Sequence, residues 1–251
     1  MATGKYDGYK VMIAGSTSGI GLSITEMFLR EGATVLGLGR NFENVQHLGD
    51  RYIPFKCDVT DLDQIRAACD KVRELFDGHL DVFINSAGVG VHYSVKEVTS
   101  EKFDFAVDLL LKSSVMFTRY CYEYLEQAEH GSPVIIHVSS IGARTIEPGD
   151  ILYGICKTGM NLYSKQSAGG LPGVRVMSLS PGPFITPIFA KSRTPEETEQ
   201  VIKYMGTLIP SGRMAEPDEI GDLVSFLCSD EASYINGCDI SIDGGTLTRL
   251  S

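Results

Sequence analysis

Short apolar segments alternate with longer amphipathic segments along almost the whole chain, and this alternation restricts the fold more than any other feature. The apolar segments are short and are bounded by turn-forming residues, which predicts strands. The expected strands are residues 10–14, 34–38, 52–56, 81–85, 134–138, 175–179 and 239–242. Helices are expected at residues 18–31, 62–76, 100–128 and 150–168, in a short acidic segment capped by Thr194, and from Pro217 to about Ser229.

Strands that are apolar throughout and are joined by helices predict a parallel sheet covered on both faces. Right-handed crossovers then give an α/β, doubly wound sheet of Rossmann type, with helices on both faces and ligands at the carboxyl ends of the strands. No linker, internal repeat or low-complexity segment interrupts the pattern. Residues 1–251 are therefore expected to form a single domain.

The formal net charge of −10 and the absence of any run of lysine or arginine argue against binding to nucleic acid or to an anionic membrane. The six cysteines show no C-x-x-C spacing and no neighbouring histidine, so we expect no metal site. We expect the protein to reside in a reducing compartment, with its cysteines as free thiols. No apolar run approaches the roughly 18 residues of a membrane span. We expect a cytoplasmic protein.

A glycine-rich segment follows the first expected strand directly and opens the first expected helix. Glycines there let the backbone approach a pyrophosphate, and the amides and dipole of the helix N-terminus attract its charge. The alternative is a glycine-rich connection that binds no ligand. The candidate cofactor-binding residues of this segment are Gly15, Ser16, Thr17, Ser18, Gly19, Ile20 and Gly21.

The second expected strand ends at Gly39 and Arg40, with no acidic residue at its tip. In dinucleotide-binding folds a carboxylate at this position favours NAD, whereas an arginine accommodates the 2′-phosphate of NADP. We therefore expect NADP(H), with NAD as the alternative cofactor. An ordinary surface arginine is the other interpretation of Arg40.

Tyr153 and Lys157 lie one turn apart on an expected helix, so they share one face of it. An ammonium beside a phenol favours the phenolate and is expected to lower the tyrosine pKa. Ser140 ends the fifth expected strand, where its hydroxyl can donate to a substrate carbonyl or simply cap the next turn. Small residues at positions 85–88 end the fourth strand and leave room for a cofactor.

In this order, these segments resemble the short-chain dehydrogenase/reductase family from Lys10 to Gly245. The resemblance matches the family's catalytic residues to Ser140, Tyr153 and Lys157 and its C-terminal Asp-Gly-Gly to residues 243–245. It also implies cofactor contacts at Asp58, Val59, Asn85, Ala87, Gly88, Tyr153, Lys157, Pro181, Gly182, Phe184 and Thr186.

The implied activity is interconversion of a carbonyl and a secondary alcohol by hydride transfer, with Tyr153 as general acid or base. Ser140 would position the substrate oxygen, and Lys157 would hold the nicotinamide ribose and lower the pKa of Tyr153. His92, Tyr93 and Phe184 are further candidates for contact with the substrate. Arg144 and Glu147 could set the polarity of the cleft, a lid is expected at about 183–210, and the assembly is expected to be a homotetramer or homodimer.

The apolar residues near the expected cleft mildly favour a hydrophobic ketone or alcohol. An NAD-dependent dehydrogenase of a hydroxysteroid or cyclic alcohol is the main alternative. A departure from the family pattern supports a more remote alternative function. Many members carry an asparagine in the long helix, and Leu110 occupies that position in this sequence. Leucine cannot hold the water that links the lysine to solvent, so a dinucleotide-binding sensor with little turnover stays an alternative.

Overall fold

The computed structural model describes residues 4–186 and 194–249, and its centre is a seven-stranded sheet. All strand pairs are parallel, in the order β3-β2-β1-β4-β5-β6-β7. The chain builds outward from β1 to β3 and then crosses back to β4, so the strand order reverses between β1 and β4. The strands are β1 (Lys10–Ala14), β2 (Thr34–Gly39), β3 (Tyr52–Lys56), β4 (Val82–Asn85), β5 (Val134–Val138), β6 (Arg175–Pro181) and β7 (Asp239–Ile242).

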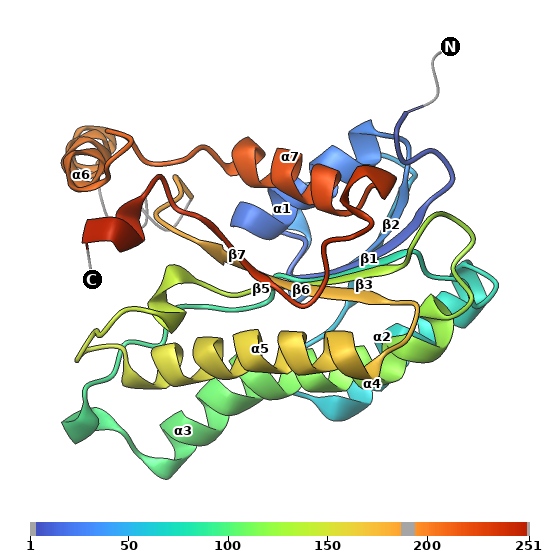
Figure 1. Ribbon diagram of the computed structural model, residues 1–251, viewed down its shortest axis with the longest axis horizontal. Helices are drawn as coiled ribbons and strands as arrows, with labels where there is room; N and C mark the ends of the chain where they lie inside the picture. The colour runs from blue at the N-terminus through green and yellow to red at the C-terminus, as the bar shows by residue number, and fades with distance from the viewer. Residues whose placement is uncertain (1–3, 187–193, 250–251) are drawn as a thin grey trace.

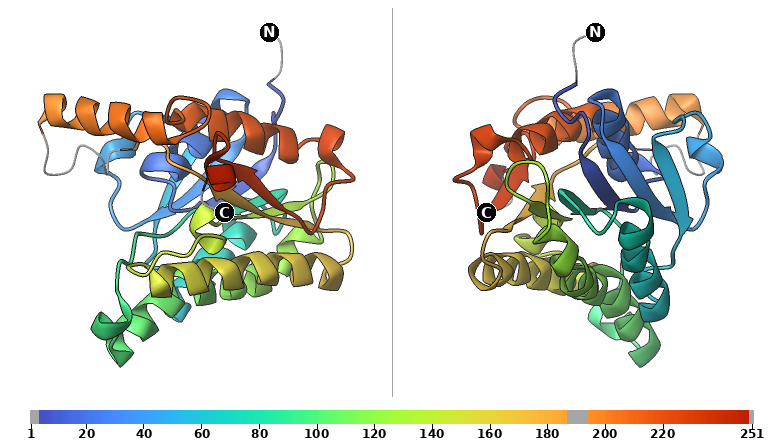
Figure 2. Two further views of the ribbon diagram at one scale, coloured as in Figure 1. Left: turned by 60° about the vertical axis from the view of Figure 1, so that its left-hand side comes forward. Right: turned by 90° about the vertical axis from the view of Figure 1, so that its right-hand side faces the viewer.

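Helices cover both faces of this sheet, as the views of Figures 1 and 2 show. The helices are α1 (Gly19–Arg30), α2 (Leu62–Leu75), α3 (Ser100–Val107), α4 (Ser113–Leu125), α5 (Ile151–Gly170), α6 (Pro195–Leu208) and α7 (Pro217–Leu227). One apolar core, with Phe28 of α1 and Val224 of α7, lies on one face of the sheet. The other core, with Ile65 of α2 and Phe117 of α4, lies on the opposite face. The predicted doubly wound α/β fold is confirmed.

The helix expected at residues 100–128 is divided into three parts. Thr99 caps its first part by accepting a hydrogen bond from the amide of Lys102. α3 then passes through a π-helical turn, Asp108–Lys112, into α4. A π turn inserts one extra residue per turn and shifts the side chains that follow, and such turns often occur at functional sites. Leu110 lies within this turn.

Part of the expected lid, residues 187–193, lies outside the described residues. The acidic segment after Thr194 is the helix α6, and its capping box is present: the Thr194 hydroxyl accepts from the Glu197 amide at 3.2 Å, and the Glu197 carboxylate accepts from the Thr194 amide at 2.8 Å. Figure 1 shows α6 set apart from the sheet. Within residues 4–186 and 194–249, no helix combines the length and apolar character needed to cross a membrane.

Candidate active site

The parallel register brings the candidate segments to one edge of the sheet. Ala14 at the end of β1 is paired with Asn85 at the end of β4, and Asn85 is paired with His137 of β5. The amide of Gly15 then donates to the carbonyl of Leu38 at 2.9 Å. The glycine-rich turn, the segment 85–88 and Ser140 therefore all follow carboxyl ends of neighbouring strands, where ligands bind in such folds.

The turn after β1 fits the pyrophosphate of a dinucleotide. Gly15 has a φ of +78°, and a Cβ there would lie 2.8 Å from the amide nitrogen of Ala87, so no side chain is tolerated. A Cβ on Gly21 would lie 2.0 Å from the carbonyl oxygen of Gly15. Ser18 is extended at the N-terminus of α1 and its side chain makes no capping hydrogen bond. The first amides of a helix without a side-chain cap are available to an anionic ligand.

The sides of this turn are supported by neighbouring strands. Ser16 is fully buried, and its hydroxyl forms a hydrogen bond of 2.8 Å with the phenol of Tyr52 in β3. Gly37 leaves space for that phenol, because a Cβ at this position would lie 2.2 Å from the Tyr52 ring. On the other side, Thr17 contacts Gly39 closely enough that a Cβ on Gly39 would lie 2.7 Å from the Thr17 methyl.

Arg40 and Asp58 lie near each other beyond the ends of β2 and β3. Arg40 is exposed, and its guanidinium contributes to lowering the pKa of Asp58. The larger causes of that lowered pKa are hydrogen bonds from the amide and the hydroxyl of Thr60, at 3.0 and 2.8 Å. Val59 beside them is buried. A cation and a carboxylate thus stand together where the sequence predicts the adenosine end of the cofactor.

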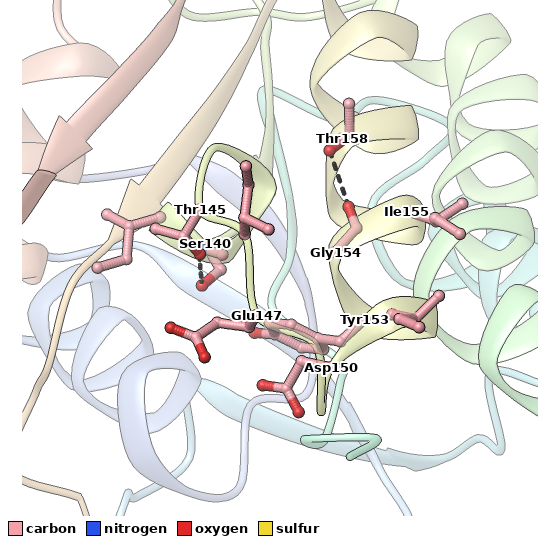
Figure 3. Close-up of a pocket in the computed structure, with 12 residues that line it drawn as sticks. Ser140, Thr145, Glu147, Asp150, Tyr153, Gly154, Ile155 and Thr158 are labelled. Carbon is pink, nitrogen blue, oxygen red and sulfur yellow. Dashed lines mark hydrogen bonds between the residues drawn. The ribbon is translucent and has the colours of Figure 1, made fainter. Parts of the chain in front are cut away.

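Ser140 and Tyr153 line one cavity of about 690 Å³, shown in Figure 3. The Ser140 hydroxyl accepts a hydrogen bond of 3.0 Å from the amide of Gly142, which leaves its own proton available to donate. Gly142 also allows the two residues to come close: a Cβ there would lie 3.3 Å from the Tyr153 ring and 3.4 Å from the Ser140 oxygen. Carboxylates of Glu147 and Asp150 border the same cavity beside Tyr153.

Lys157 lies behind Tyr153 and is almost completely buried. Its ammonium donates a hydrogen bond of 2.7 Å to the carbonyl of Val138 and lies 5.7 Å from the centre of the Tyr153 ring. The hydroxyl of Ser139 donates to the carbonyl of Lys157 at 3.2 Å, which attaches α5 to the end of β5. Burial lowers the pKa of Lys157 to about 8.

The expectation that Lys157 lowers the pKa of Tyr153 is wrong. Burial raises the pKa of Tyr153, the Ser140 hydroxyl offsets part of this rise, and the Asp150 carboxylate adds to it. The physical reason is that desolvation of the phenol dominates, while the ammonium of Lys157 is directed to the Val138 carbonyl. A raised pKa keeps Tyr153 protonated at neutral pH, the state in which it can donate a proton.

Leu110 fills the position where the family pattern has asparagine. It is fully buried and packs in a small apolar cluster with Val91, Leu152 and Cys156. A Cβ on Gly88 would lie 3.1 Å from a Leu110 methyl and 3.9 Å from the Lys157 nitrogen, so these groups meet at one point. An apolar side chain therefore stands near Lys157, on the other side of Gly88, where the family pattern has a polar amide.

Several expected substrate contacts lie outside the lining of the cavity. Phe184 is buried in the core with α1 and α7, and Tyr93 lies beneath the ammonium of Lys102. His92 is hydrogen-bonded to Asp150, so it reaches the cavity only through that carboxylate. Arg144 does not line the cavity, because its guanidinium forms an ion pair with Asp239 of β7. The expectation that Arg144 sets the polarity of the cleft is therefore wrong.

The segment after β6 returns to the glycine-rich turn. Thr186 lies 3.7 Å from where a Cβ of Gly19 would stand. Gly182 follows Pro181 and packs against Asp243, to which a Cβ would come within 2.8 Å. Asn85 is buried and directs its amide to the Ser114 hydroxyl at 2.9 Å, toward α4 rather than into the cavity.

The sequence interpretation did not single out two polar features of this site. Thr145 and Asp150 line the cavity within residues 141–152, which the sequence places in the wall of the cleft without naming either residue. His137 lies behind the site, fully buried, with its ring nitrogen 3.1 Å from the hydroxyl of Thr118. Burial, with a smaller contribution from the charge of Lys157, lowers the pKa of His137 to about 3. No group of three or more potential metal-binding side chains occurs in the described ranges.

Known proteins resemble this chain over nearly its full length. A family model described as enoyl-(acyl carrier protein) reductase matches residues 14–247. The chain is 32% identical to the 3-oxoacyl-[acyl-carrier-protein] reductase of Thermotoga maritima, covering 96% of this chain and 98% of that one. It is also 32% identical to the D-threitol dehydrogenase of Mycolicibacterium smegmatis, covering 96% and 94%. The L-sorbose reductase of Gluconobacter frateurii, solved with NADPH and L-sorbose, superimposes with a TM-score of 0.88 at 28% identity, covering 98% and 99%.

With this extent of similarity, the chain belongs to the short-chain dehydrogenase/reductase family. It is an oxidoreductase that acts on CH–OH or C=O groups with NAD or NADP.

Proposed function

We propose that this protein is an NADP(H)-dependent oxidoreductase that interconverts a carbonyl and a secondary alcohol. The observation that carries the proposal is the cavity in which Ser140 and Tyr153 stand together, with Lys157 directly behind them. The bound nicotinamide supplies or accepts the hydride. All other steps are assigned to side chains of this chain.

In the reductive direction Tyr153 donates a proton to the oxygen of the substrate as its charge develops. Ser140 donates a hydrogen bond to the same oxygen and holds it in place. The ammonium of Lys157, fixed by the Val138 carbonyl, would hold the nicotinamide ribose when the cofactor is bound. In the oxidative direction Tyr153 accepts the proton.

The cofactor assignment rests on the glycine-rich turn and Arg40. The turn supplies amides to the pyrophosphate, and Gly39 with Arg40 forms the edge where the ribose is expected. A guanidinium binds a 2′-phosphate in two hydrogen bonds, which favours NADP over NAD. The relative solved with NADPH supports this assignment. The remaining cofactor contacts proposed are Asp58, Val59, Asn85, Ala87, Gly88, Pro181, Gly182, Phe184 and Thr186.

We propose a hydroxylated substrate, because the carboxylates of Glu147 and Asp150 border the cavity, although the sequence mildly favours a hydrophobic ketone or alcohol. Thr145, Glu147 and Asp150 contribute oxygen atoms to the lining, while Ile141, Ile146, Ile151 and Ile155 make the larger part of it apolar. Carboxylates accept hydrogen bonds from hydroxyl groups and repel an anionic substrate. The D-threitol and L-sorbose enzymes among the relatives support a polyol or ketose as the substrate class. We also propose that residues 183–210 act as the lid and that the chain forms a homotetramer or homodimer.

A panel of ketoses, polyols, cyclic ketones, hydroxysteroids and 3-oxoacyl thioesters, assayed with both cofactors by NAD(P)H absorbance, tests this function. We expect the highest kcat/KM for a polyol or ketose with the NADP form. Turnover of a hydroxysteroid or cyclic alcohol with NAD would replace the proposal with the NAD-dependent alternative. A thermal shift with cofactor but no turnover of any substrate would instead favour a dinucleotide sensor, the interpretation that Leu110 supports.

A further inference from the structure

Asp239 is the first residue of the edge strand β7, and its carboxylate contacts three other elements. One oxygen accepts from the Ser180 hydroxyl of β6 at 2.6 Å. The other accepts from the Asn161 amide of α5 at 2.7 Å and from the Arg144 guanidinium. The side chain of Asp239 is only 15% exposed, so little water competes for these bonds.

Two of these partners belong to the segments that carry the proposed catalytic groups. Asn161 lies four residues after Lys157 and eight after Tyr153, so the three share one face of α5. Arg144 lies four residues after Ser140, at the end of the turn that lines the cavity. It also donates to the Ser241 hydroxyl at 2.8 Å and to the Asp239 carbonyl at 3.1 Å. One carboxylate is therefore bonded both to the Ser140 loop and to α5.

This connection bears on catalysis because Ser140 and Tyr153 must reach the same substrate oxygen from two different segments. Their relative position depends on whatever ties those segments together. The Thr158 hydroxyl bonds the Ala143 carbonyl at 2.8 Å, which is a direct tie. Asp239 supplies a second tie, through a charged pair with the next residue, Arg144. A displacement of about 1 Å between reacting groups can reduce a rate by roughly 100-fold.

We infer that Asp239 is a positioning residue, which holds the Ser140 loop and α5 in register through Arg144 and Asn161. Asp239 is not among the residues that line the cavity. The inference rests on the proposed function, because it assigns Asp239 a part in aligning Ser140 with Tyr153. Nothing in the local sequence of β7 indicates this role; the tertiary fold alone brings residues 144, 161 and 239 together.

Asp239→Asn tests the inference, since the amide keeps the size of the side chain but loses the charge and an acceptor. We expect kcat to fall roughly 10-fold or more while KM changes less than about twofold and NADPH affinity is kept. Asp239→Glu should recover part of kcat. Asp50→Asn is the matched control, because Asp50 is exposed in the loop before β3, and it should leave kcat unchanged.

The double variant Arg144→Met/Asp239→Asn separates this role from general destabilisation. If Asp239 acts through Arg144, the double variant should lose little more kcat than Asp239→Asn alone. Hydrogen exchange provides a readout that needs no turnover: amides in 141–149 should exchange faster in Asp239→Asn, with the oligomeric state unchanged. Arg144→Met and Asn161→Ala repeat the test if Asp239→Asn does not fold.

Unchanged exchange in 141–149 together with a kcat within twofold of the original protein would overturn the inference. A lower melting temperature with unchanged kcat would also overturn it, because it would show a purely structural role. If the original protein turns over no substrate, the proposed function fails, whereas faster exchange in 141–149 would still support the tie made by Asp239.

Discussion

The ammonium of Lys157 donates its hydrogen bond to the carbonyl of Val138, 2.7 Å away, at the last residue of β5. This bond holds the lysine beneath Tyr153 and directs it along the end of the strand. Leu110 stands near the same nitrogen, on the other side of Gly88. The charge of Lys157 thus lies in an almost dry environment, which accounts for the lowered pKa of its side chain.

Replacing Leu110 with asparagine should change proton transfer at Lys157. An amide there can bind a water molecule beside the ammonium, so we expect kcat to rise severalfold and the solvent isotope effect on kcat to fall. The polar amide in an apolar cluster should also reduce the free energy of unfolding by about 1–3 kcal/mol. Steady-state kinetics in H₂O and D₂O measure the first effect and urea unfolding the second. Leu110→Met is the control, and an isotope effect identical in both variants would contradict the prediction.

Replacing Tyr153 with phenylalanine should nearly abolish turnover while NADPH still binds. The variant loses the proton donor, which we expect to reduce kcat by about 10²- to 10⁴-fold. Fluorescence titration of NADPH and steady-state kinetics separate binding from chemistry. Tyr234→Phe is a suitable control because Tyr234 is fully exposed. Activity close to that of the original protein in Tyr153→Phe would remove Tyr153 from the proposed mechanism.

Replacing Arg40 with alanine should lower the preference for NADPH over NADH. The loss of a guanidinium–phosphate contact is worth about 1.5–3 kcal/mol, or roughly a 10- to 100-fold change in the ratio of kcat/KM values. Efficiency with NADH should change little. The control is Arg30→Ala. Arg30 lies at the C-terminal end of α1, away from the glycine-rich turn, so this substitution should leave the ratio of kcat/KM values unaltered. Equal efficiency with both cofactors before and after Arg40→Ala would rule out NADP selection by this residue.

Stability should fall in acid because of His137. Its pKa is about 3 in the folded protein, against an ordinary value of 6.5, so below pH 6.5 the unfolded chain binds a proton that the folded protein excludes. The contribution of His137 is complete above pH 6.5 and is lost progressively as the pH falls toward 3. From pH 6.5 to about pH 4 the loss is on the order of 3 kcal/mol.

The free energy of unfolding in urea, measured across this pH range, checks the prediction. His137→Gln removes the titrating ring and can still bond Thr118, so its stability should depend less steeply on pH than that of the original protein. His47→Gln, which changes an exposed histidine, should keep the original slope. Parallel curves for His137→Gln and the original protein would show that His137 does not titrate with a lowered pKa.

Much of the architecture could be predicted from periodicity. The expected strand at 10–14 coincides with β1, and the helix expected at 62–76 differs from α2 by one residue. Gly32 ends α1 with a φ of +101°, as expected for a glycine after a helix. These features depend on neighbouring residues, so local pattern is sufficient to reveal them. The π turn at Asp108–Lys112 was not predicted, because an extra residue in a helix leaves no local signal in one sequence.

The sequence by itself determined the parallel sheet, the glycine-rich turn and the order in which Ser140, Tyr153 and Lys157 occur. Only the tertiary structure decided the environment of those side chains. It partly buried Tyr153 so that the pKa of its phenol rises, directed the Lys157 ammonium to the Val138 carbonyl, and paired the Arg144 guanidinium with Asp239 outside the cavity. The physical reason is that desolvation and charge pairing depend on groups distant in the chain, which strand pairing and helix packing bring into contact.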